Sequence, residues 1–246
     1  MPTLLEEEKN RAISADGMWL NGHFLHWWLL PSLYVHASWL PHLVPDAQLS
    51  LISTDSTAAE SEHATLHRAL HQHWSAQLLA QQGVDSAQLA AITGHPVLPV
   101  CMASPALLDR WLLHAGMLMV GPLLRRCIDR NSRMQIQQTL GDQALDWAVH
   151  TAPKLHAGVA TMTQLQWHGL DPAASMRWLG AQLLAVALAD ACTALRERMQ
   201  WRLPMHWQSL ETPDAHWPVP ADACAISLQL MNTLDFAWLS SLPKTH

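Results

Sequence analysis

The chain has 246 residues, of which 50% are hydrophobic and only 14% are charged, and its formal net charge is −6. This length suffices for one well-packed domain. The charge balance argues against a nucleic-acid binder, which needs a clustered basic face. The most apolar run, residues 178–189, is shorter than the roughly 20 residues that span a bilayer, so we expect a soluble protein without membrane insertion.

Helical periodicity dominates and no alternating β-branched run occurs, which predicts an all-α fold. In chain order we expect helices at residues 17–30, 61–82, 105–120, 122–131, 132–140, 142–151, 154–167, 171–199 and 223–242. The helix at 171–199 is apolar nearly all round over residues 178–195 and is predicted to be a long, buried central helix. A Pro-rich linker at 211–223 precedes the last helix. We therefore expect a single globular helical domain over residues 1–210, with the linker and C-terminal helix of 211–246 packed on it.

Little in the sequence favours an enzyme. There is no GxSxG, P-loop or GxGxxG pattern, so we expect no catalytic residue, no cofactor and no small-molecule substrate. The four cysteines form no CxxC pair, and the acidic N-terminus is unlike a secretory signal. Reduced thiols and a cytoplasmic location follow as expectations.

The strongest candidate for metal binding is a row of histidines. His63, His67 and His71 are spaced four residues apart and would lie along one side of a helix. A His pair at this spacing is half of a zinc or nickel site. The HExxH pattern is absent, and a solvated His-rich face explains the same residues. We expect no metal site, and keep a helical metalloprotein as an alternative.

A basic cluster interrupts the acidic chain. Within nine residues lie four of the 11 arginines, Arg125, Arg126, Arg130 and Arg133. Asp129 is spaced to pair with Arg125 or Arg133. These arginines predict either an ordinary solvated helix face with local ion pairs or a docking surface for an acidic partner, because guanidinium groups bind carboxylates well.

A turn of sequence HASWLP occupies residues 36–41, after an aromatic helix. In the segment of helix and turn, Pro31 and Pro41 together with His26 and His36 exclude a membrane span. Trp39 and Leu40 are expected to pin that helix to the core. His36 and Trp39 are also candidates for partner contact, since exposed tryptophans mark interaction sites, and we favour the packing role.

Three stretches in order resemble one family. FLHWWLLPSLYVHASWLP, residues 24–41, resembles the N-terminal signature of the SctK (YscK) proteins of type III secretion, although Ala37 stands where the family often has proline. GPLLRRCIDRNSRMQIQQTLGDQALDWAVHTAP, residues 121–153, resembles the family's middle block. RERMQWRLP, residues 196–204, is similar to the end of its closing helix.

This resemblance, covering about residues 18–204, implies a non-enzymatic cytoplasmic adaptor of the sorting platform, peripheral to the inner membrane through its protein partners. Those partners are the inner-membrane ring protein (SctD) and the pod protein (SctQ), with no nucleic acid. Besides the metalloprotein, a type III secretion chaperone or other effector-binding module remains an alternative.

Overall fold

A computed structural model of the chain describes residues 22–43, 60–127, 130–158, 171–207 and 217–242. In these ranges every regular element is an α-helix or a 3-10 helix, and none is a strand. The all-α prediction is confirmed. None of the helices in these ranges is long and apolar enough to cross a membrane.

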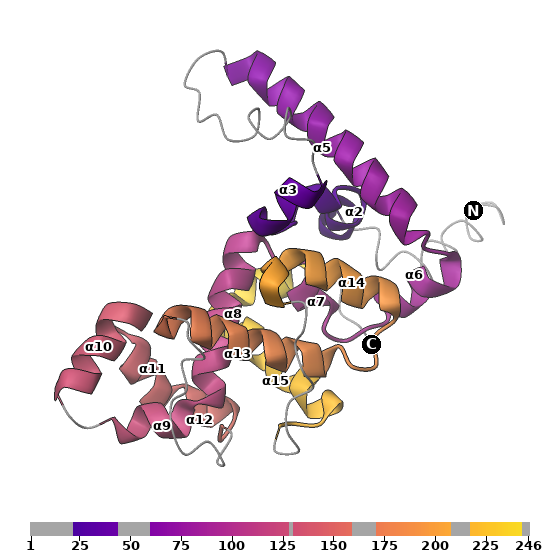
Figure 1. The fold of residues 1–246 in the computed structure, drawn as a ribbon. Helices are drawn as coiled ribbons and strands as arrows, with labels where there is room; N and C mark the ends of the chain where they lie inside the picture. The colour runs from indigo at the N-terminus through magenta and orange to yellow at the C-terminus, as the bar shows by residue number, and fades with distance from the viewer. Residues whose placement is uncertain (1–21, 44–59, 128–129, 159–170, 208–216, 243–246) are drawn as a thin grey trace, which may run out of the picture. The chain divides into compact units, whose positions relative to one another are not determined.

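Figure 1 shows the helices in order along the chain. The chain divides into two compact units, each made of separate stretches of the sequence. Unit 1 takes in the described residues of Met1–His95, Cys192–Gln208 and Ser240–His246, and unit 2 those of Pro96–Ala191 and Ser209–Leu239. The expected division between residues 1–210 and 211–246 stays a prediction.

Unit 1 is built around one long helix and the segments beside it. Its elements are α2 (Gly22–Leu29), η1 (Pro31–Leu33), η2 (Ala37–Trp39), α3 (Leu40–Leu43), α5 (Glu60–Gln82), α6 (Ser86–Thr93), α14 (Thr193–Arg202) and η3 (Met205–Trp207). Helix α5 packs against η1 and α2 and buries Trp74 and Leu78. It ends at Gly83, whose φ of 55° is a left-handed conformation that glycine adopts without strain.

Unit 2 is a helical cluster. Its elements are α7 (Leu98–Cys101), α8 (Pro105–Met119), α9 (Gly121–Arg126), α10 (Arg130–Leu140), α11 (Ala144–His150), α12 (Ala152–Leu155), α13 (Pro172–Ala187), α15 (Pro220–Leu234) and most of α16 (Phe236–Ser240). Helix α8 begins as its sequence predicts, because Ser104 caps it by accepting a hydrogen bond from the Leu107 amide.

Helices α8 and α13 cross at two glycines. A Cβ atom on Gly116 would overlap the backbone of Met176, and one on Gly180 would overlap the backbone of Leu112. The two helices can therefore approach to backbone contact only because neither glycine carries a side chain. Helix α15 packs against this pair.

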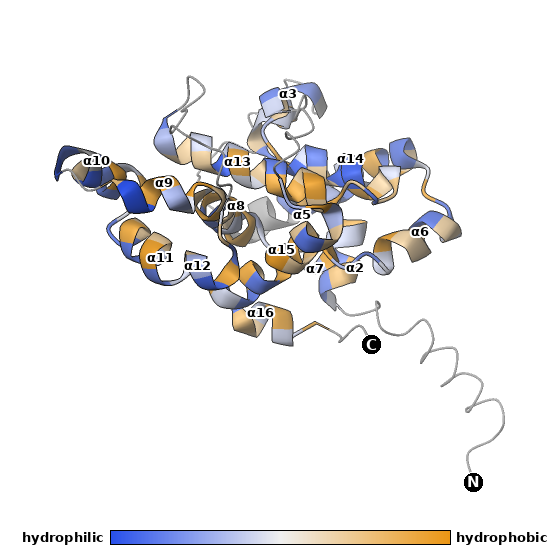
Figure 2. Cartoon of the chain, turned by 90° about the horizontal axis from the view of Figure 1, so that it is seen from below, coloured by the Kyte–Doolittle hydropathy of each residue, from blue (hydrophilic) through white to orange (hydrophobic). Residues whose placement is uncertain are grey.

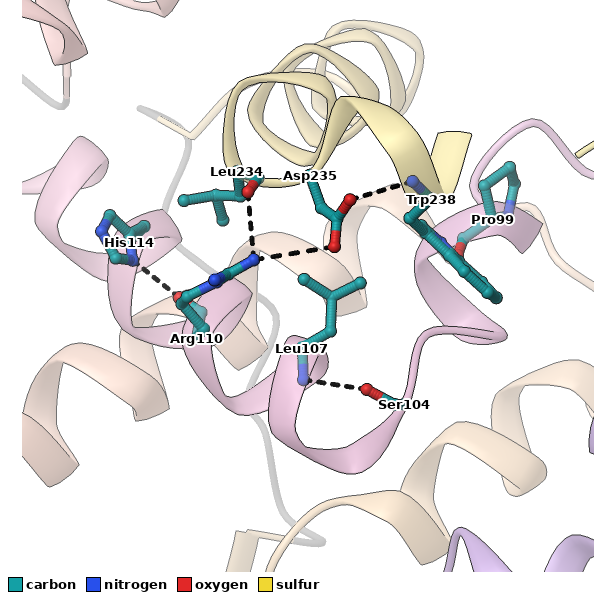
Figure 3. Close-up of polar contacts among 8 residues, drawn as sticks. All are labelled: Pro99, Ser104, Leu107, Arg110, His114, Leu234, Asp235 and Trp238. Carbon is teal, nitrogen blue, oxygen red and sulfur yellow. Dashed lines mark hydrogen bonds and ion pairs between the residues drawn. The ribbon is translucent and has the colours of Figure 1, made fainter. Parts of the chain in front are cut away.

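The end of α15 is fixed to α7 and α8 by polar contacts (Figure 3). Arg110 Nη2 donates to the Leu234 carbonyl at 3.0 Å and lies 3.9 Å from the Asp235 carboxylate. That carboxylate accepts from the Trp238 amide at 2.9 Å, and Trp238 Nε1 donates to the Pro99 carbonyl at 3.0 Å. Asp235 thus ends α15 and caps α16, so the single helix predicted at 223–242 is wrong.

The long central helix predicted at 171–199 is also wrong. Asp171 caps α13 as expected, but the helix ends at Ala187 and α14 starts at Thr193. Cys192 is extended, with ψ of 154°, and the chain passes from unit 2 to unit 1 at this position. The longest described helix is instead α5, with 23 residues.

The helix predicted at 154–167 is wrong over residues 156–158. Helix α12 ends at Leu155, His156 is extended and Gly158 has φ of 87°, which no helix allows. The rest of that prediction lies outside the described residues.

Candidate functional site

The four clustered arginines fall into two groups. Arg125, on α9, is half-buried and donates from Nη1 to the Ala148 carbonyl at 3.3 Å and from Nη2 to the Ala157 carbonyl at 3.4 Å. Its guanidinium therefore ties α9 to α11 and to the segment after α12. Arg126, Arg130 and Arg133 are exposed.

Helix α10 presents one polar side to solvent. Ile136 and Leu140 form its buried stripe. Arg130, Arg133, Met134 and Gln137 are three and four residues apart, so they share one side of the helix; we call this set the α10 face. In Figure 2 most of α10 is coloured as hydrophilic, whereas α8 is mostly hydrophobic.

The α10 face combines positive charge with apolar surface. Arg130 and Arg133 are exposed, and the Met134 side chain is 45% exposed. The sequence of α10, RNSRMQIQQTL, contains no acidic residue to neutralise the arginines. Asp129, predicted to pair with Arg125 or Arg133, lies outside the described residues. An exposed methionine among arginines is the composition that protein interfaces favour.

The polar groups of the turn at residues 36–41 form hydrogen bonds within the turn and with the end of α14. The His36 side chain accepts from the Ser38 amide at 3.1 Å and caps η2, and the His36 amide donates to the Trp201 carbonyl at 2.8 Å. Trp39 Nε1 donates to the Leu203 carbonyl at 2.9 Å. Both side chains are half-buried. The turn is thereby attached to the end of α14 within unit 1.

Two of the three candidate histidines of the alternative metal site are described with their side chains. His67 is exposed and His71 is buried, and their Nε2 atoms lie 3.3 Å apart. Burial, and secondly the nearby His67, lowers the pKa of His71 to about 4, so its imidazole is neutral at pH 7. The side chain of His63 lies outside the described residues. Elsewhere in the described part of the chain, no group of three or more metal-binding side chains gathers.

Arg198 is a central residue that the sequence analysis does not single out. It is 2% exposed and donates to the Trp27 and Trp28 carbonyls at 3.2 and 2.9 Å, and to Gln82 Oε1 from Nη2 at 2.9 Å. Its guanidinium lies 4.2 Å from the centre of a Trp28 ring. Burial lowers its pKa to about 9, which leaves it charged at pH 7. Its position in the sequence of α14, on the same side of the helix as Leu195 and Met199, could have indicated that Arg198 is buried.

Comparison with known proteins yields one finding. The family model described as "YOP proteins translocation protein K (YscK)" matches residues 23–235. No curated protein and no solved structure matches the chain. The matched region contains the 36–41 turn, the arginine cluster and Arg198, and it covers most of the chain. The chain therefore belongs to the YscK family, the SctK proteins of type III secretion systems.

Proposed function

We propose that this protein is a non-enzymatic adaptor of a type III secretion sorting platform, with the α10 face as a docking site for an acidic surface of a partner. The adaptor acts in the cytoplasm, peripheral to the inner membrane through protein contacts. It bridges the cytoplasmic domain of the ring protein SctD and the pod protein SctQ. Family membership supports a role within the secretion apparatus.

The observation that carries the docking site is the exposure of Arg130, Arg133 and Met134 on one side of α10. Guanidinium groups bind carboxylates in a two-pronged geometry, and methionine adapts to an apolar partner surface. Arg126 adds a third exposed guanidinium four residues before Arg130. Arg125 is not part of the site, because its guanidinium is bonded to carbonyl groups of unit 2.

We assign His36 and Trp39 to packing rather than to docking. Their polar atoms bond to the turn itself and to the end of α14. A partner that used these groups would first have to break those hydrogen bonds, which would oppose binding.

The test is a double charge reversal, Arg130→Glu with Arg133→Glu, in cells that express the whole apparatus. Recovery of SctQ or SctD in pull-downs should fall at least about tenfold, since like charges would replace opposite ones. The circular dichroism spectrum should not change, because both side chains are exposed. Raising the salt concentration should weaken the wild-type complex.

Two matched variants give the test its specificity. Arg196→Glu reverses an exposed arginine on α14 and should leave recovery unchanged. Trp39→Phe removes the bond to the Leu203 carbonyl and should also retain the partner. Full recovery by the double reversal, or loss only in Trp39→Phe, would contradict the α10 docking site. Co-purification with a secreted substrate in place of SctD and SctQ would contradict the adaptor role.

A further inference from the structure

The paired histidines of α5 have the arrangement of two metal ligands. His67 and His71 are one helical turn apart, with their Nε2 atoms at 3.3 Å and their ring centres at 4.4 Å. His67 is exposed, so the pair can be reached from solvent, whereas His71 is fixed in the protein. The two imidazoles thus form a pair in which one ring is anchored and the other can adjust.

Hydrogen bonds around Ser32 determine which nitrogen of His71 is available. Ser32 Oγ lies 2.9 Å from the His71 carbonyl oxygen, which can only accept, and 2.9 Å from His71 Nδ1. If the single hydroxyl hydrogen goes to the carbonyl, Nδ1 must donate its own hydrogen to Oγ. Nε2 then carries the lone pair, and that lone pair is on the side of His67.

This arrangement is the one that metal-binding histidines use. A ligating imidazole commonly donates its second N–H to a neighbouring acceptor, which fixes the tautomer and the ring orientation. Here Ser32 on η1 is that acceptor for His71 on α5. The Ser32 hydroxyl is itself buried and lies 2.8 Å from Ser75 Oγ. The position of Ser32 is therefore fixed by a second contact within unit 1.

The separation of the two nitrogens matches a shared ion. Two Zn–N bonds of about 2.0–2.1 Å at a tetrahedral angle place their nitrogens roughly 3.3–3.4 Å apart.

We propose that His67 and His71 bind a late first-row divalent cation through their Nε2 atoms, with Ser32 as the positioning residue for His71. Imidazole ligands suit zinc, nickel and copper. Water would complete the coordination, as at sites with open positions. The ion would join His67 to His71 across one turn of α5. It would thereby stabilise the hydrogen bonds between His71 and Ser32, which connect α5 to η1.

The experiment is a titration of the tag-free full chain with Zn²⁺ alone, followed by calorimetry and by the thermal unfolding temperature. We expect one ion per chain and a rise in unfolding temperature, since an ion that binds only the folded state stabilises it. His67→Gln should weaken binding at least about tenfold without changing the fold, because His67 is exposed. Ser32→Ala should weaken it about tenfold while both histidines remain.

The matched control is His73→Gln. His73 is an exposed histidine of the same helix, and its Nε2 lies 3.1 Å from Gln77 rather than from a second histidine. This variant should bind Zn²⁺ as wild type does. Equal affinity in wild type and His67→Gln, or equal losses in His67→Gln and His73→Gln, would overturn the proposal. Neither result bears on the α10 face, which lies in unit 2.

Discussion

Different kinds of contact hold the helices together inside the two units. In unit 2, α8 and α13 meet backbone to backbone at Gly116 and Gly180. In unit 1, α2, α5 and α14 are joined by polar side chains, because Arg198 bonds to the end of α2 and to Gln82, and Ser32 bonds to His71. The helix crossing in unit 2 requires two residues without a side chain, whereas the helix contacts in unit 1 require buried side chains that donate hydrogen bonds.

This difference determines which changes each unit tolerates. A close-packed crossing of helices cannot accept added volume. A polar junction accepts changes of volume more readily, but it fails when a buried acceptor loses its donor. Unit 2 should therefore be sensitive to side-chain size, and unit 1 to side-chain chemistry.

The largest effect should come from adding volume to unit 2. In Gly116→Val the new side chain would overlap the backbone of Met176, and backbone atoms cannot move aside as a flexible side chain can. We expect the free energy of unfolding to fall by more than about 4 kcal/mol, or the protein not to fold. Urea unfolding followed by circular dichroism measures the loss.

Gly22→Ala is the control for this prediction. A Cβ on Gly22 would meet nothing within 4 Å, so the change should be neutral or stabilising by about 0.5 kcal/mol. A stable, cooperatively folded Gly116→Val protein would show that the α8–α13 crossing is looser than described.

A smaller loss of folding stability should follow from removing the guanidinium group of Arg198 in unit 1. Arg198→Met retains much of the volume but leaves the Trp27 and Trp28 carbonyls and Gln82 Oε1 without their donor. These carbonyls belong to the last turn of α2, where no helical partner exists. We expect a loss of about 2–4 kcal/mol in urea unfolding.

Arg196→Met serves as the control on the same helix, since Arg196 is exposed and should change stability by less than about 0.5 kcal/mol. If Arg198→Met were as stable as wild type, the desolvation of the guanidinium would outweigh its hydrogen bonds, as occurs for some buried charges.

The smallest effect should be the part of the pH dependence of stability that comes from His71 in unit 1. The pKa of His71 is about 4 in the folded chain, below the ordinary histidine value of 6.5. Between these values the unfolded chain binds a proton that the folded chain does not. The contribution of His71 is therefore complete above about pH 6.5 and is lost as the pH falls toward 4, with about 1–2 kcal/mol lost by pH 5.0.

Urea midpoints at pH 7.5 and 5.0 test this dependence in wild type and in His71→Gln. His67 is the other titratable group facing His71, and it is present in both proteins. The decline should be shallower in the variant. Equal declines would mean that His71 is protonated in the folded chain at pH 5.0.

Local sequence signals predicted the helix starts but not the breaks. Ser104 with Pro105 and Asp171 with Pro172 marked the starts of α8 and α13, because capping depends on neighbouring residues. The interruption between α13 and α14 contains neither glycine nor proline. It coincides with the passage of the chain between units, which is a property of the whole fold and not of a local window.

The same limit applies to the candidate site. Composition identified the arginine cluster, but it could not separate Arg125, whose bonds reach Ala148 and Ala157, from the exposed Arg133. Helical phase would have placed Met134 beside Arg130, since the two residues are four apart on one helix. For Arg198, helical phase indicates burial beside Leu195 and Met199, but not the groups it bonds to, because Trp28 lies 170 residues away in the chain.

That separation has a consequence for how the protein is made. Trp28 leaves the ribosome 170 residues before the arginine that completes its surroundings. At synthesis rates of about 5–20 residues per second, the delay is roughly 10–30 s. During this time α2 and α5 exist without α14, and the ring faces that Arg198 will cover are open to water or to other proteins. Unit 1 is thus begun first and completed late in translation.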